Sequence, residues 1–131
     1  MLFFKYDSSK DDLDVLCFAS RSITDAFVPA TIKYICPFAF SDSEIQSIDF
    51  DENSEIEVIN KKTFSYSKII EIRFLKSVKI IGEGAFLNCH FLTKIEFPEN
   101  SELQIIETRA FANSAIRSFN IPLKFVEFRG S

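Results

Sequence analysis

Apolar residues recur along the chain in a fixed pattern whose period is between 22 and 25 residues. Each period contains a nine-residue segment. This segment starts with an apolar residue, has a second one three positions later, and ends in a small residue followed by phenylalanine. The four segments with this pattern are 32–40, 56–64, 78–86 and 103–111, which end at Phe40, Phe64, Phe86 and Phe111. A second block follows each phenylalanine, at 45–50, 69–74, 92–97 and 116–121, with apolar residues at its first, fourth and sixth positions. The spacing of two at the end of this block predicts a β-strand.

This repetition predicts a solenoid. One period cannot bury its own apolar side, so neighbouring periods stack and their apolar sides form one continuous core. We expect a right-handed coil, mainly parallel β with short helical turns, with about five repeats in a single domain over residues 1–131. An earlier turn is recovered with the same offsets at Phe18, Ile23, Ala26 and Val28.

The two ends depart from the pattern. Residues 1–12 are out of register with the repeats and are expected to form an N-terminal cap. Residues 123–131 begin another turn and are expected to be an incomplete repeat or a tail. An uncapped solenoid end exposes its core, so we expect this end either to continue into further chain or to pair with a partner.

The most regular stretch of the chain resembles the BspA-like leucine-rich repeat. It reads Val78-Lys-Ile-Ile-Gly-Glu-Gly-Ala-Phe-Leu-Asn-Cys-His-Phe-Leu-Thr-Lys-Ile-Glu-Phe-Pro98, and the resemblance covers residues from 13 to 128. The resemblance implies a curved solenoid with a parallel sheet on its concave side. It also implies surface display, adhesion to host or matrix proteins and protein–protein contact, and it is the reason to expect a cell-surface location.

Composition narrows the classes of function. The chain has a formal net charge of -4 and a pI near 5.0. Nucleic-acid binders need a basic face to replace phosphate counterions, so we expect no nucleic-acid partner. No apolar stretch is long enough to span a bilayer, so no direct membrane insertion is expected in this segment. Charged residues follow too soon after Met1 for a secretory signal.

The three cysteines are an odd count without a CxxC pair, which argues against a disulfide framework and against a zinc site. In the repeat alignment Cys17 takes the small position before the phenylalanine, and Cys89 takes the small position three residues after it. Both are expected to pack in the core. Cys36 falls in a turn and is the one expected to meet solvent, where a reactive or partner-linked thiol is the lesser alternative.

No catalytic or metal-binding set emerges from the sequence. His90 is the single histidine and is expected at the surface, because one histidine beside one cysteine supplies only half of a zinc site. The acidic loop 51–55 lacks the glycine and the donor spacing of a calcium hand, so it is interpreted as a solvated turn. We expect neither enzymatic activity nor a cofactor.

The outward positions of the predicted sheet form two columns of polar and charged residues. The first column is Asp25, Ser47, Glu71, Lys94 and Ser118, and the second is Phe27, Asp49, Arg73, Glu96 and Asn120. Charges alternate along both columns, so neighbouring side chains are expected to pair. The sheet is therefore either a solvated, self-paired surface or a binding face. The candidate binding residues are Phe27, Asp49, Glu71, Arg73, Lys94, Glu96 and Asn120.

A second feature is an apolar stripe at the third position of each return segment, which is polar in the family that the chain resembles. The stripe consists of Tyr34, Val58, Ile80 and Ile105. It predicts a second, buried row of strands or, if exposed, an interface. The leading hypothesis is a binding module for a protein or glycan, with a role in cell adhesion or as a surface antigen. The alternative is a structural repeat unit that self-associates into a homo-oligomer.

Overall fold

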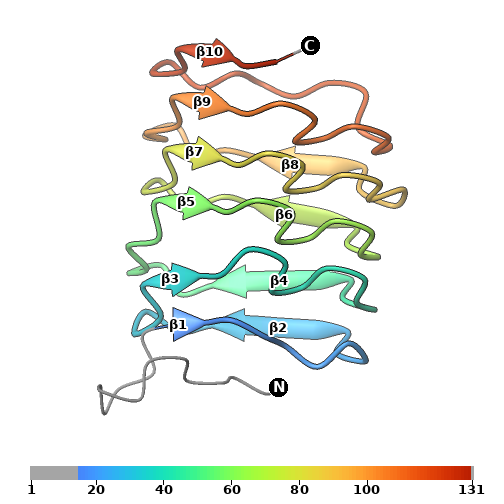
Figure 1. The fold of residues 1–131 in the computed structure, drawn as a ribbon. Helices are drawn as coiled ribbons and strands as arrows, with labels where there is room; N and C mark the ends of the chain where they lie inside the picture. Colours follow the sequence, from blue (N-terminus) through green and yellow to red (C-terminus); the bar gives the residue numbers. More distant parts are fainter. Residues whose placement is uncertain (1–14, 131) are drawn as a thin grey trace.

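The computed structural model describes residues 15–130, which wind into a parallel β-solenoid of about five turns (Figure 1). The first four turns each contribute two strands and the later chain adds β9 and β10, and Figure 1 shows the strands stacked in two rows. The row of longer strands contains β2 (Asp25–Val28), β4 (Ser47–Phe50), β6 (Glu71–Arg73) and β8 (Lys94–Glu96). The row of two-residue strands contains β1 (Val15–Leu16), β3 (Tyr34–Ile35), β5 (Val58–Ile59), β7 (Ile80–Ile81), β9 (Ile105–Ile106) and β10 (Glu127–Phe128).

All strand pairs are parallel, as the repeat predicted. The longer strands pair as β2 with β4 and β6 with β8, whereas the short ones form the pair β1-β3 and a four-stranded sheet in the order β10-β9-β7-β5. The predicted short helical turns do not occur between residues 15 and 130. After β3, β5, β7 and β9, left-handed residues interrupt the chain within a few residues, so the backbone cannot continue as a helix there.

The core is a column of stacked rings. Phe40, Phe64, Phe86 and Phe111 lie one above another, with centroids 5.1 to 5.2 Å apart and planes within 6° of parallel. Isoleucines of the two strand rows pack around this column, and the first three rings are fully buried. The four phenylalanines of the sequence repeat thus occupy one structural position in successive turns.

The first turn departs from this arrangement and corrects the sequence alignment. The Ala19 amide donates to the carbonyl of Ala39, just as the Phe40 amide donates to Thr63 and the Phe64 amide to Ala85. Ala19 therefore occupies the phenylalanine position, and the ring of Phe18 is 42% exposed. The interpretation of Phe18 as the first core phenylalanine is wrong, because the segment from Leu16 to Ala19 is two residues shorter than that from Ile35 to Phe40.

Two columns of left-handed residues shape the turns after the short strands. The first is Phe38, Lys62, Gly84 and Arg109, and the second is Asp42, Tyr66, Asn88 and Asn113, all with φ between 53° and 65°. Only one of these eight residues is glycine, although a side chain disfavours this conformation. In the second column the Asn113 amide donates to Oδ1 of Asn88 at 2.8 Å, which begins an asparagine ladder.

Tyr66→Asn is expected to raise the free energy of unfolding by about 0.5 to 1 kcal/mol, because asparagine tolerates the left-handed conformation better than tyrosine. The new side chain also offers an acceptor to the Asn88 amide and so extends the ladder. Urea denaturation of the variant beside Tyr66→Phe measures the effect. Equal stability of the two variants would show that the left-handed backbone at Tyr66 carries no cost.

The predicted N-terminal cap, residues 1–12, lies outside the described residues. At the other end, the segment predicted as an incomplete repeat contributes β10, whose residues pair in register with Ile105 and Ile106. Several apolar side chains of this last segment are exposed, with Leu123 at 97% and Val126 at 68%. Phe111, Phe119 and Phe128 line an open depression at the same end of the solenoid.

Candidate functional site

The outward side chains of β2, β4, β6 and β8 form one surface, here called the long-strand face. Its residues lie opposite one another in the register that the predicted columns require. Asp25 faces Ser47 and Phe27 faces Asp49, while Glu71 faces Lys94 and Arg73 faces Glu96. The fifth turn presents Ser118 and Asn120 at the equivalent positions, both exposed, although no strand forms there. The structure thus brings the candidate residues onto one side of the solenoid.

Charge pairing on the long-strand face is concentrated at its C-terminal end. Glu96 accepts from Arg73 at 3.0 Å and from Lys94 at 2.9 Å. The hydrogen bond from Lys94 is the main reason why the pKa of Glu96 lies below its usual value, and the same bond raises the pKa of Lys94. The expected pair between Glu71 and Lys94 does not form, because the lysine reaches the carboxylate two residues further along its own strand.

The N-terminal end of the same face is acidic and aromatic. Ser47 donates its hydroxyl to Asp25 at 2.6 Å. Asp49 and Glu71 are exposed, and neither has an ion pair within the described residues 15–130. Phe27, 47% exposed, stands beside Asp49 in the register of β2 and β4. This half of the face therefore presents carboxylates and a ring toward solvent.

The apolar stripe of Tyr34, Val58, Ile80 and Ile105 lies on the outward side of the short strands. The predicted second row of strands is present, with Val58 facing Ile80 and Ile80 facing Ile105. The expected burial is only partial, since Tyr34 is 46% exposed and the other three are half-buried. The neighbouring residue of each strand points inward instead, as Ile35 and Ile59 show.

Charged side chains flank this stripe. Lys79 donates to Glu57 at 2.6 Å, and Lys33 donates to Glu55 at 3.3 Å. The hydrogen bond to Glu57 raises the pKa of Lys79. The stripe is therefore an apolar band one residue wide that is bordered by paired charges.

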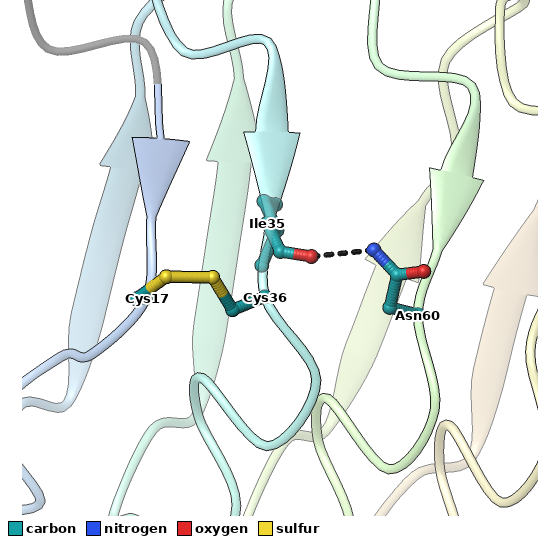
Figure 2. The surroundings of a disulfide bond; sticks show 4 residues. All are labelled: Cys17, Ile35, Cys36 and Asn60. Carbon is teal, nitrogen blue, oxygen red and sulfur yellow. Dashed lines mark hydrogen bonds between the residues drawn. A yellow bond between two sulfur atoms is a disulfide. The ribbon is translucent and has the colours of Figure 1, made fainter. Parts of the chain in front are cut away.

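The first two cysteines form a disulfide, contrary to the sequence interpretation. Cys17 and Cys36 follow the paired strands β1 and β3, with their Cα atoms 4.6 Å apart (Figure 2). The expectation that Cys17 is a small core residue and Cys36 a separate turn residue is wrong, because the corrected register of the first turn puts both in the same slot. In the next turn this slot holds Asn60, which donates its side-chain amide to the carbonyl of Ile35 at 2.6 Å.

Cys89 is a buried free thiol, as the repeat predicted. Its thiol donates to the carbonyl of Phe64 at 3.0 Å and lies 3.6 Å from the hydroxyl of Ser67. Burial raises the pKa of Cys89, and hydrogen bonds to Ser67 and Tyr66 offset the rise only in part. Cys89 is therefore a packing residue of the core that surrounds the stacked rings.

The raised pKa of Cys89 predicts a pH dependence of stability. The pKa of Cys89 is higher in the folded protein than in the unfolded one. Its contribution to the free energy of unfolding is therefore complete below the unfolded pKa and is lost as the pH rises through the folded pKa. We expect the free energy of unfolding to fall more steeply above pH 8 in the wild-type protein than in Cys89→Ser. Parallel curves for the two proteins, from urea denaturation at successive pH values, would contradict this.

Three further observations concern metal binding, the acidic loop and membrane spans. Within residues 15–130 no three histidine, cysteine, aspartate or glutamate side chains lie close enough together to hold a metal ion. In the acidic loop, the carboxylate of Asp51 accepts the amide of Asn53 at 2.8 Å. The same range of residues contains no helix long and apolar enough to cross a membrane.

Sequence reasoning missed three exposed apolar side chains. Tyr66 and Phe91 are each 57% exposed and Ile70 is 45% exposed, all on neighbouring turns. Phe91 reaches the surface because two residues separate Cys89 from Leu92, whereas one residue separates Ser67 from Ile69. The unequal spacing was readable in the sequence and is the signal for the exposure of Phe91.

Comparisons with known proteins agree with the geometry. Residues 12–131 match the model of the BspA type leucine-rich repeat region, with six copies. The structure superposes on the pneumococcal vaccine antigen PcpA with a TM-score of 0.77 and 32% identity, over 82% of this chain and 27% of that one. It also superposes on a leucine-rich cell surface protein of Faecalibacterium prausnitzii A2-165, with a TM-score of 0.59 and 16% identity, over 89% of this chain and 39% of that one. A search of curated proteins gives no significant match. The chain thus spans well under half of either solved structure.

Proposed function

Because the chain belongs to the BspA-type leucine-rich repeat family, we propose that it is a non-enzymatic binding module whose long-strand face contacts a protein or glycan partner. The face is extended and regular, and its side chains are not needed for the core. Repeat solenoids offer extended surfaces of this kind for contact with large partners. The proposal makes the surface, and not a pocket, the functional part of the molecule.

The observation that carries the proposal is the uneven pairing of the long-strand face. Arg73, Lys94 and Glu96 bond to one another, whereas Asp49 and Glu71 are exposed without an ion pair in the described chain. Together with the exposed ring of Phe27, these carboxylates suit a partner that brings a basic and an apolar group. Aromatic residues are enriched at the centres of protein interfaces, where they contribute much of the binding energy.

We further propose that this binding takes place at a cell surface, in adhesion or as an antigen. The disulfide between Cys17 and Cys36 supports an oxidising location, since such bonds persist mainly outside the reducing cytosol. The similarity to PcpA, a vaccine antigen, is in keeping with a surface position.

The test is binding of the purified chain to immobilised matrix proteins and to a glycan array. We expect saturable binding to at least one of them, weakened by Asp49→Lys and by Phe27→Ala. Lys61→Glu, an exposed change away from the long-strand face, is the matched control and should leave binding unchanged. Binding to no member of these panels, or equal losses in all three variants, would count against the long-strand face as the site.

The alternative function is self-association through the apolar stripe, favoured by the partial exposure of Tyr34, Val58, Ile80 and Ile105. A contiguous apolar band on a surface marks an interface more often than scattered apolar residues do. Multi-angle light scattering of the wild type should then show a dimer or a larger species, and Ile80→Glu should shift it to a monomer without loss of fold. A monomer at high wild-type concentration would exclude this alternative.

A further inference from the structure

The stacked phenylalanine rings that join the later turns do not extend to the first turn of the solenoid. The ring column ends at Phe40, because Ala19 supplies only a methyl group at the equivalent position. In the long-strand row Ala26 faces Ile48, so a small side chain again meets a large one. The first interface therefore lacks the ring stacking that joins the later turns.

Within this first turn, two segments are held very differently. β2 pairs with β4 through four residues in register, from Asp25 against Ser47 to Val28 against Phe50. β1 pairs with β3 through two residues only. The segment 15–21, which contains β1 and the turn after it, thus depends on other contacts to stay in place.

Backbone hydrogen bonds join this segment to the second turn, among them those from the Cys36 amide to the carbonyl of Leu16 and from the Ala19 amide to the carbonyl of Ala39. Two further contacts involve side chains. The disulfide joins Cys17 to Cys36 immediately after the two-residue strand pair (Figure 2). The guanidinium of Arg21 lies 4.4 Å from the ring centroid of Phe18 and donates to the carbonyl of Ala39 at 3.0 Å. Of these two, only the disulfide is covalent, and both of its cysteines are partly exposed to solvent.

We propose that the Cys17–Cys36 disulfide is a redox-sensitive latch that holds segment 15–21 over the second turn. When the latch is closed, this segment covers the edge of β3 and the outer face of the Phe40 ring. When it opens, β1 leaves β3 while β2 and the later turns keep their places. The opened form presents an unpaired strand edge, to which another extended segment can pair.

The reductant is a dithiol. One thiolate of the dithiol attacks a sulfur of the latch, and the other protein sulfur leaves as a thiolate that takes up a proton. The second thiolate of the dithiol then attacks the mixed disulfide and releases the other protein cysteine, which is also protonated. The protein gains two electrons and two protons, and the dithiol is oxidised to its own disulfide.

The later turns do not need such a latch. Phe40, Phe64, Phe86 and Phe111 stack at 5.1 to 5.2 Å, and neither cysteine of the disulfide belongs to this column. In a solenoid each turn contacts only its neighbours, so opening one end need not disturb the other turns. The proposal therefore predicts a local change that is confined to the first turn.

The first part of the test counts thiols. The full chain, purified in air and denatured without reductant, should react with a thiol reagent at one position, Cys89. After reduction it should react at all three cysteines. Three reactive thiols without reduction would mean that the latch does not form, and the proposal would fail.

The second part measures opening by hydrogen exchange and by limited trypsin digestion with and without a dithiol. Reduction should speed cleavage after Arg21 by about tenfold or more and should raise exchange in residues 15–21 and 34–36. The Cys17→Ser/Cys36→Ser variant should behave in air as the reduced wild type does, whereas Cys89→Ser should respond to reduction as the wild type does.

Two results of this second part would overturn the proposal. One is equal protection of residues 15–21 in the oxidised, reduced and double-variant proteins. The other is increased exchange around Phe64 and Phe86 upon reduction, because the disulfide would then support the whole solenoid and not a local latch.

Discussion

Phe64→Ala lowers the free energy of unfolding by about 3 to 5 kcal/mol, the range for removing a large aromatic side chain from a packed core. The ring of Phe64 is fully buried and lies 5.2 Å from that of Phe40 and 5.1 Å from that of Phe86. Removing it leaves a gap between two rings that the strand ladders hold at a fixed spacing, so the cavity cannot close. Urea denaturation followed by circular dichroism measures the loss.

The control for this prediction is Phe91→Ala. Phe91 has the same side chain but is 57% exposed on the outside of the solenoid. Its removal should change the free energy of unfolding by no more than about 0.5 kcal/mol, as for most surface substitutions. A similar loss in both variants would mean that the ring column does not carry the stability assigned to it.

The sequence predicted the later turns well, because their physical constraints repeat. A parallel solenoid needs the same inward positions in every turn, so the positions of Phe40, Phe64 and Phe86 and of the strands after them follow from spacing alone. The first turn broke this rule. Its segment from Leu16 to Ala19 is two residues shorter than the equivalent segment of the next turn, and Phe18 satisfied the pattern one position too early. That shift also hid the disulfide, since Cys17 and Cys36 fall in one slot only in the corrected register.

The candidate site was predicted in part. The alternation of inward and outward residues predicted that Glu71 lies beside Lys94 and Arg73 beside Glu96, and the register of β6 and β8 confirms both. It did not predict that Lys94 would bond to Glu96 on its own strand, because a long flexible side chain reaches several carboxylates at similar cost. Nor could spacing decide the exposure of Tyr34, since exposure depends on which of two adjacent apolar residues faces the core.

Gly82→Ala is expected to lower the free energy of unfolding by about 1 to 3 kcal/mol, because it forces an atom into a closely packed position. A methyl group at Gly82 would lie 2.8 Å from the carbonyl oxygen of Ile59, and that oxygen is already fixed by accepting the Gly82 amide at 2.7 Å.

Gly84→Asn is the control. Gly84 has a φ of +59°, which Lys62 and Arg109 also adopt, and its new side chain would meet mainly the flexible side chain of Lys62. We expect this control to cost less than about 1 kcal/mol. Thermal and urea unfolding of both variants decide the matter, and a larger loss at Gly84 than at Gly82 would show that backbone conformation, and not the close approach of turns, requires these glycines.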